Sequence, residues 1–366
     1  MKFTLSKQEL LRYLLITEKL SGKNLSLPVL NGTQIVVEKN VVILRATNLD
    51  IGIEVRTPAK IEKLGSCVVP GSILSQVLQN SFRGEYVTLS KEENILTVES
   101  EDGNTSIHTI PDEDFPPLPQ ISDAKTISLS ALEIVQGINS VWYSASNSTI
   151  KPELASVYVY PQGKDIFFVS TDSFRLAEKR VSTSGEVLFD YFLIPIRNSL
   201  DIARVLETIK GEVEIRFNEH QVSFIFDSIY LTSRLIDGSF PDYKQIIPKE
   251  FFSEITLLKS DLVNACKKTN VFSDKFHQVQ FSIQPNKKRL TVKAKNPDVG
   301  ETVTNLDAVI EGEELDISFN LRYITDAFQV IQTDSVTLSF GGVGKPMVMR
   351  GVGDSSFVYV VMPMNR

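Results

Sequence analysis

One short motif occurs three times at equal spacing in this 366-residue chain, and this repetition limits the possible folds more than any other feature. The middle copy begins at Thr171, continues through Asp172 to Arg175, and follows a strand-like apolar run. Its counterparts begin at Thr47 upstream and at Lys295 downstream. The differences 171 − 47 and 295 − 171 are both 124 residues, nearly a third of the chain. Equal steps of this size predict three copies of one structural unit.

The segments around the motif repeat as well. Each copy opens with a short strand that leads into a helix, and Ser6 with Glu9 and Ser130 with Glu133 have the spacing of a capping box. A second helix is predicted in each copy, near residues 70–78, 195–206 and 319–328. Most of the remaining sequence alternates between polar and apolar residues, the pattern of half-buried strands. We expect an α+β fold in which every copy packs two helices on sheets of about eight short strands.

Two proline-containing joins separate the copies. Phe115 precedes a proline in the first join and Phe240 precedes one in the second, and 240 − 115 is 125 residues. Proline cannot extend a helix or a central strand, so these joins mark boundaries. They predict three domains, 1–122, 123–248 and 249–366.

The composition is that of a folded, soluble protein. Hydrophobic residues make up 42% and charged residues 23%, and no apolar run approaches the length of a membrane span. The N-terminus lacks the apolar core of a signal peptide. Cys67 and Cys266 lie far apart in apolar surroundings, which favours two core thiols over a disulfide framework. We expect a cytoplasmic protein without a membrane segment.

The sequence contains no recognisable catalytic constellation. His108, His220 and His277 fall at non-equivalent positions of the three copies and lack partners at metal-ligand spacing. The acidic run 112–114 lies in a proline-flanked join, where a solvated loop is the simpler interpretation than a metal site. The glycine-rich run 341–345 has the wrong spacing for a phosphate loop and favours a hairpin turn. We therefore expect no bound metal, no cofactor and no active site.

Positive charge is concentrated on the predicted helices although the net charge is −7. Acidic residues are more frequent in the strands and joins. Ordinary solvated helix faces would explain this pattern as well as a segregated basic surface for nucleic acid does.

The chain resembles the beta subunit of bacterial DNA polymerase III, the sliding-clamp family, over its whole length. The shared segments are Met1-Lys2-Phe3-Thr4, Leu27-Pro28-Val29-Leu30, Thr171-Asp172-x-x-Arg175-Leu176-Ala177, Phe240-Pro241-Asp242-Tyr243, Asn320-x-x-Tyr323 and Tyr359-Val360-Val361-Met362-Pro363-Met364. The resemblance implies a head-to-tail homodimer, a closed ring of six domains with helices lining the hole. Twelve helices of ~10 Å each would leave an opening on the order of 25–30 Å, enough for a DNA duplex.

The resemblance also implies roles for individual residues. Duplex DNA would face basic residues of the ring lining, namely Lys7, Arg12, Lys23, Lys151, Arg197, Arg204, Lys210, Lys267 and Lys268. Partner peptides would dock in an apolar cleft formed by Leu154, Thr171, Phe174, Arg175, Leu176, Pro241, Ile246, Asn320, Tyr323, Val343, Val360, Met362, Pro363 and Met364. The dimer contact would join Ile107 of one subunit to Val271 and Phe272 of the other. The implied partners are the polymerase III alpha subunit, the clamp loader, other polymerases, ligase and repair proteins with clamp-binding peptides.

The chain departs from the family pattern at several of these positions. Ser173-Phe174 replaces the usual Gly-His and should make that pocket more apolar, and Lys244 is followed by Gln245 instead of a second basic residue. Lys151-Pro152-Glu153 and Lys23-Asn24 replace loops that often contact DNA.

Two rival functions are a three-domain peptide-binding adaptor that does not encircle DNA, and an enzyme in its own right. The missing carboxylate constellation argues against the enzyme.

Overall fold

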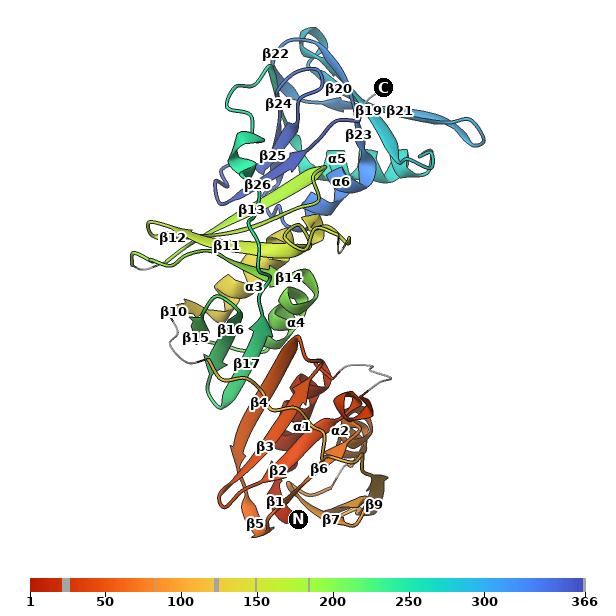
Figure 1. Cartoon of the computed structure of the whole chain (residues 1–366). Helices are drawn as coiled ribbons and strands as arrows, with labels where there is room; N and C mark the ends of the chain where they lie inside the picture. The colour runs from red at the N-terminus through yellow and green to blue at the C-terminus, as the bar shows by residue number, and fades with distance from the viewer. Residues whose placement is uncertain (22–26, 82, 122–124, 149, 184, 365–366) are drawn as a thin grey trace. The chain divides into compact units, whose positions relative to one another are not determined.

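In its described residues, the computed structural model contains four antiparallel sheets and six α-helices (Figure 1). It describes residues 1–21, 27–81, 83–121, 125–148, 150–183 and 185–364. The helices are α1 (Lys7–Glu18), α2 (Gly71–Asn80), α3 (Ala131–Val141), α4 (Ile196–Leu206), α5 (Lys259–Asn270) and α6 (Leu321–Asp326). Each predicted copy therefore contains two helices, as the sequence pattern indicated.

Contacts divide the chain into two compact units. Unit 1 comprises Met1–Val135 and Arg197–Leu235, and unit 2 comprises Gln136–Ile196 and Ile236–Arg366. The middle copy of the repeat therefore contributes strands to both units. The first predicted domain boundary, at 122/123, lies outside the described residues.

Unit 1 contains two sheets. The five-stranded sheet has the order β5 (Lys60–Lys63), β1 (Lys2–Ser6), β7 (Tyr86–Glu92), β8 (Ile95–Ser100), β9 (Gly103–His108). The eight-stranded sheet has the order β10 (Lys125–Ser130), β15 (Glu212–Phe217), β16 (Gln221–Phe226), β17 (Ile229–Arg234), β4 (Ile51–Pro58), β3 (Val41–Thr47), β2 (Thr33–Val37), β6 (Gly65–Val69). Strand β17 of the second copy pairs with β4 of the first, so one sheet continues from copy to copy.

Unit 2 repeats this arrangement. Its nine-stranded sheet has the order β14 (Phe192–Pro195), β11 (Ser156–Gln162), β12 (Asp165–Thr171), β13 (Arg175–Ser182), β26 (Phe357–Val361), β25 (Met347–Gly351), β24 (Ser335–Phe340), β18 (Ser253–Leu258), β22 (Val309–Gly312). Its four-stranded sheet has the order β21 (Gly300–Asp307), β20 (Arg289–Asn296), β19 (Gln278–Gln284), β23 (Leu315–Asn320). Here β13 of the second copy pairs with β26 of the third. The junctions 1–2 and 2–3 are thus built by the same strand pairing.

The capping boxes form to different extents. Ser130 Oγ accepts from the Glu133 amide at 3.2 Å, and the Ser130 amide donates to the Glu133 carboxylate at 2.9 Å, which completes the box. Ser6 Oγ likewise accepts from the Glu9 amide at 3.4 Å. The Glu9 carboxylate, however, accepts from Thr57 of β4 at 2.8 Å, so this acid joins α1 to the sheet.

Both cysteines are free and buried, as the sequence predicted. Burial raises the pKa of the Cys67 thiol and of the Cys266 thiol to about 12. At pH 8 the thiolate fraction should therefore be lower by ~10³ than for an ordinary thiol, because each pKa unit is tenfold. We expect neither thiol to react with iodoacetamide in the native protein and both to react in denaturant, measured by mass spectrometry. Rapid labelling of the native protein at pH 8 would contradict the burial of these thiols.

Candidate partner-binding site

The repeated motif forms the turn between β12 and β13. Thr171 Oγ1 donates to the Arg175 carbonyl at 2.6 Å and accepts from the Ser173 amide at 3.1 Å. Asp172 Oδ1 accepts from the amides of Phe174 and Arg175 at 2.9 and 3.0 Å. Ser173 has a φ of 77°, a conformation that favours glycine. The turn leaves the Phe174 side chain exposed beside the sheet.

The same hydrogen bonds recur 124 residues earlier, between β3 and β4. Thr47 Oγ1 donates to the Ile51 carbonyl at 2.8 Å. Asn48 Oδ1 accepts from the amides of Asp50 and Ile51 at 3.0 Å each. Leu49 has a φ of 80°. The predicted repeat is therefore confirmed, for the first two copies, at the level of single hydrogen bonds.

The C-terminal strand β26 lies beside this turn. Leu176 is the register partner of Val360, and both side chains are buried. Past the strand, the Met362 amide donates to the Phe174 carbonyl at 2.8 Å, and the Met364 amide donates to Ser318 of β23 at 2.8 Å. The backbone of Met362 thus lies beside the turn, while that of Met364 pairs with β23, and both methionines and Pro363 are half-buried.

Arg175 links the turn to helix α6. Its Nε donates to Asp172 at 3.0 Å and its Nη1 donates to Asp326 at the end of α6. The guanidinium carbon lies 4.6 Å from the ring centroid of Tyr323 and 5.9 Å from that of Tyr143. One arginine therefore holds elements of the second and third copies together.

Arg175 stays protonated in this site. Burial alone would lower the pKa of Arg175, but Tyr359, Asp326 and Asp172 together raise it above its ordinary value. Tyr359 itself donates to the Tyr323 carbonyl at 2.7 Å. The sequence analysis assigned site roles to Arg175 and Tyr323 but none to Asp326, Tyr143 or Tyr359, because no local pattern joins residues this far apart in the chain.

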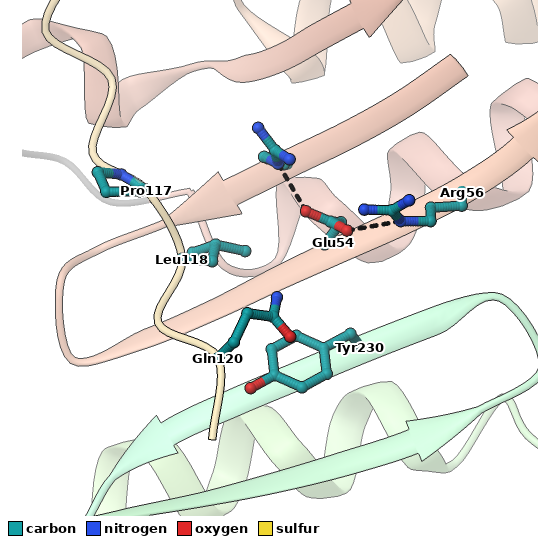
Figure 2. Close-up of a pocket in the computed structure, with 7 residues that line it drawn as sticks. Glu54, Arg56, Pro117, Leu118, Gln120 and Tyr230 are labelled. Carbon is teal, nitrogen blue, oxygen red and sulfur yellow. Dashed lines mark hydrogen bonds and ion pairs between the residues drawn. The ribbon is translucent and has the colours of Figure 1, made fainter. Parts of the chain in front are cut away.

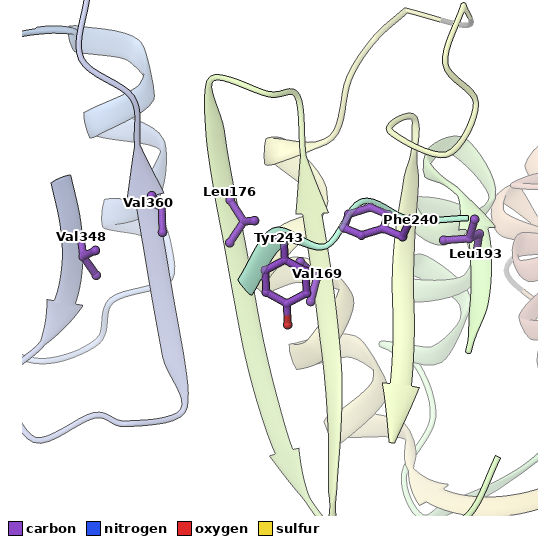
Figure 3. Close-up of a cluster of buried hydrophobic side chains, with 7 residues drawn as sticks. All are labelled: Val169, Leu176, Leu193, Phe240, Tyr243, Val348 and Val360. Atoms are coloured by element: carbon purple, nitrogen blue, oxygen red, sulfur yellow. The ribbon is translucent and has the colours of Figure 1, made fainter. Parts of the chain in front are cut away.

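The second join packs across the sheet of unit 2. Phe240 and Tyr243 belong to one buried cluster with Val169, Leu176 and Val360 (Figure 3). Tyr243 donates its hydroxyl hydrogen to the Glu178 carboxylate and lies 2.6 Å, oxygen to oxygen, from Tyr160. Burial, with the neighbouring Glu178, raises the pKa of Tyr243, so this phenol stays protonated. The join is thereby fixed against β11 and β13.

The remaining predicted cleft residues lie at different depths. Leu154 is buried before β11, whereas Pro241 and Ile246 of the join are exposed. Asn320 caps α6, its side chain accepting from the Arg322 amide at 3.0 Å. Val343 in the β24–β25 turn is 83% exposed, and this turn approaches Pro248. The structure thus brings the turn, β26 and α6 together directly, while Val343 and Ile246 are exposed apolar residues of two other segments.

Most of the predicted DNA-facing residues are exposed cations on helices. Arg12 of α1, Arg197 and Arg204 of α4, and Lys267 and Lys268 of α5 are all exposed. Lys151 and Lys210 are exposed outside the helices, and Lys7 of α1 donates to the Ser81 carbonyl at 2.8 Å. Arg204 also pairs with Asp201 at 3.0 Å. Lys23 and Asn24 lie outside the described residues.

The predicted dimer residues lie at or near sheet edges. Ile107 is buried within its own subunit on β9, an edge strand of the five-stranded sheet. Val271 and Phe272 follow α5; Val271 is 66% exposed and Phe272 is half-buried beside Gly300 of the edge strand β21. Edge strands offer unpaired backbone groups to a partner.

No described group of three or more histidine, cysteine, aspartate or glutamate residues is placed to hold a metal ion. No helix in the described ranges has the length and apolar character needed to cross a membrane.

Known proteins match this chain from end to end. The beta sliding clamp of Vibrio cholerae is 26% identical to this chain, and the match covers 100% of both chains. The beta sliding clamp of Synechococcus elongatus is 27% identical, over 88% of this chain and 87% of the relative. The crystal structure of the Thermotoga maritima DNA polymerase III beta subunit has a TM-score of 0.94 and 25% identity, covering 100% of this chain and 99% of that one.

Three family models match in order along the chain. They describe the N-terminal, central and C-terminal domains of the DNA polymerase III beta subunit, over residues 1–119, 128–242 and 244–365. Three such domains in one chain define a DNA sliding clamp of replication. The chain belongs to the family of the DNA polymerase III beta subunit.

Proposed function

We propose that two copies of this chain form a closed ring that encircles duplex DNA and tethers the replicative polymerase. Membership in the family over the full length is the observation that supports this most strongly. Retention on DNA is then topological, and contacts with phosphates need only be weak and independent of sequence. We assign the domains to 1–122, 123–248 and 249–366, which the matched spans support.

The exposed cations of α1, α4 and α5 would form the inner surface of this ring. They project from helices, whereas the chain as a whole has a net charge of −7. A positive lining within an acidic protein would guide DNA to the hole and discourage binding elsewhere.

Partner peptides would dock where the turn of residues 171–175, β26 and α6 meet. Leu176 and Val360 provide a buried apolar floor, and Phe174, Met362 and Met364 provide adaptable walls. The polymerase III alpha subunit, the clamp loader, repair polymerases and ligase are the partners we assign to this cleft. The clamp has no active site of its own and works in the cytoplasm on the nucleoid.

The dimer would be closed by the two sheet edges. We propose that β9 with Ile107 meets the β21 region with Val271 and Phe272 of the other subunit, head to tail. Both strands pair on one side only within the described chain, and the exposed apolar residues beside β21 would be covered by the contact.

The test is retention on DNA before and after the circle is opened. The clamp is loaded by its clamp loader onto a nicked circular duplex, and bound protein is measured after gel filtration. We expect retention on the circle and loss of at least ~90% on linearisation, because a threaded ring slides off an end while a phosphate-bound protein stays. Equal retention on both forms would favour the adaptor that does not encircle DNA.

A further inference from the structure

A cavity of about 480 Å³ lies on the eight-stranded sheet of unit 1 (Figure 2). It is lined by Arg45, Glu54, Arg56 and Tyr230 from β3, β4 and β17, and by Pro117, Leu118 and Gln120 from the first join. None of these residues belongs to the proposed peptide cleft, the basic lining or the dimer contact.

The strand register brings the polar side chains into one patch. Glu54 is the register partner of Arg45 on β3 and of Tyr230 on β17, and Arg56 lies two residues further along β4 on the same face. Thr57 alternates to the opposite face and donates there to Glu9 of α1. The cavity therefore opens on the face of the sheet away from α1 and its exposed Arg12.

Glu54 is a buried acid shared by two arginines. Its side chain is 6% exposed, and its two oxygens accept from Arg45 Nε at 2.7 Å and from Arg56 Nε at 2.8 Å. Burial alone would raise the pKa of Glu54, but these hydrogen bonds lower it below its ordinary value. The three side chains together have a net charge of +1. The terminal NH₂ groups of both arginines have no partner among the described residues, so each guanidinium keeps four N–H donors for a ligand.

In the second copy, the position that corresponds to this cavity is filled by a tyrosine side chain of the second join. Glu178, Val169 and Val358 form the corresponding cross-strand row, 124 residues after Glu54 and Arg45. Tyr243 of the second join covers this row and donates to Glu178. Its counterpart in the first join is Leu118, since 243 − 118 is the same 125 residues that separate the two join phenylalanines.

Differences in side-chain size at two equivalent positions explain why the cavity is present in the first copy and absent in the second. Leu176 on β13 corresponds to Gly52 on β4. Leu118 packs over that glycine, where its Cδ2 would lie 2.3 Å from an added Cβ. Leu118 thus occupies the place of the missing leucine side chain, and the space that the Tyr243 ring fills in unit 2 is left empty above Glu54.

We propose that this cavity is a second docking site, which binds an acidic side chain of a partner protein through the terminal NH₂ groups of Arg45 and Arg56. One carboxylate balances the net charge of +1, whereas a phosphate near Glu54 would bring a second negative charge into a half-buried site. The apolar Pro117 and Leu118 suit the aliphatic part of a peptide. The site is independent of the cleft at residues 171–175, so its failure would leave the proposed clamp function untouched.

The probe is a fluorescein-labelled hexaglutamate peptide titrated with the full-length clamp, measured by anisotropy. We expect the Arg45→Gln/Arg56→Gln variant to bind at least 10-fold more weakly, because both guanidiniums are lost. The matched control is Lys60→Gln/Lys63→Gln, which removes two exposed cations of β5 and should change the affinity less than 2-fold. Loss of binding in the control alone would overturn the assignment by placing the peptide on the five-stranded sheet.

A second variant leaves both arginines in place and so avoids an unpaired Glu54. Leu118→Tyr introduces the residue found at the equivalent position of the second join and should fill the cavity, with the same 10-fold loss of peptide affinity. Unchanged peptide affinity in both cavity variants would overturn the proposal. Equal binding of hexaglutamine would show that charge is not recognised, and binding of free glutarate as tight as that of the peptide would show a small-molecule site; either result would also overturn it.

Discussion

Replacing Phe272 with aspartate is expected to turn the dimeric clamp into monomers. The side chain is half-buried beside Gly300 on the edge strand β21, next to Val271, which is 66% exposed. A buried aromatic at the centre of a contact is a typical hot spot, and a carboxylate there would be desolvated without a partner. We expect the dimer dissociation constant to rise on the order of 100-fold. Light scattering along a dilution series should then give the mass of one chain, 40.9 kDa, at concentrations about 100-fold higher than for the unmodified protein.

Two further variants separate a lost contact from a lost fold. Val271→Asp places the same charge on an exposed side chain, so it should also weaken the dimer while leaving the Tm unchanged. Val309→Asp changes a residue that is 67% exposed on β22 and should remain dimeric. A dimer mass for both Phe272→Asp and Val271→Asp would remove these residues from the interface. The monomeric variants should also be lost from nicked circular DNA.

The fold could be predicted largely from the sequence because the repeat is encoded in local chemistry. The Thr-Asp motif specifies its own turn through side-chain to backbone hydrogen bonds, which depend only on residues within four positions of each other. Alternating strands and Ser-Glu boxes are local in the same sense. Each could be recognised in the sequence, and their common period predicted the architecture.

The partners of the site residues could not be predicted, since they depend on contacts between distant segments. Arg175 meets Asp326 from 151 positions away, and nothing near either residue indicates this pairing. The cavity beside Glu54 depends on a compensating pair, Gly52 with Leu118, which becomes visible only when strand and join are superposed on the second copy. The basic residues were visible as a pattern, but their exposure was not.

Replacing Arg175 with glutamine is expected to damage both stability and partner binding. The side chain is only 12% exposed, and its loss leaves the Asp172 and Asp326 carboxylates facing each other without a counter-charge. Breaking a buried ion pair from one side costs about 3 kcal/mol, and the guanidinium contact with Tyr323 is lost as well. We expect the free energy of unfolding, measured by urea denaturation, to fall by this amount. Affinity for the polymerase III alpha subunit should fall at least ~10-fold, because the turn and α6 would no longer be held together.

Arg180→Gln is the matched control for this variant. Arg180 lies on the same strand, its side chain is 37% exposed, and its contact with Asp165 is longer, at 3.8 Å. Exposed pairs of this kind contribute little, so the stability should change by less than about 0.5 kcal/mol. Adding Asp326→Asn to Arg175→Gln should restore part of the lost stability, since it removes one of the two uncompensated carboxylates. If the double variant is as unstable as the sum of the single variants, Arg175 and Asp326 are not coupled, and the link between the turn and α6 must be made by the tyrosines alone.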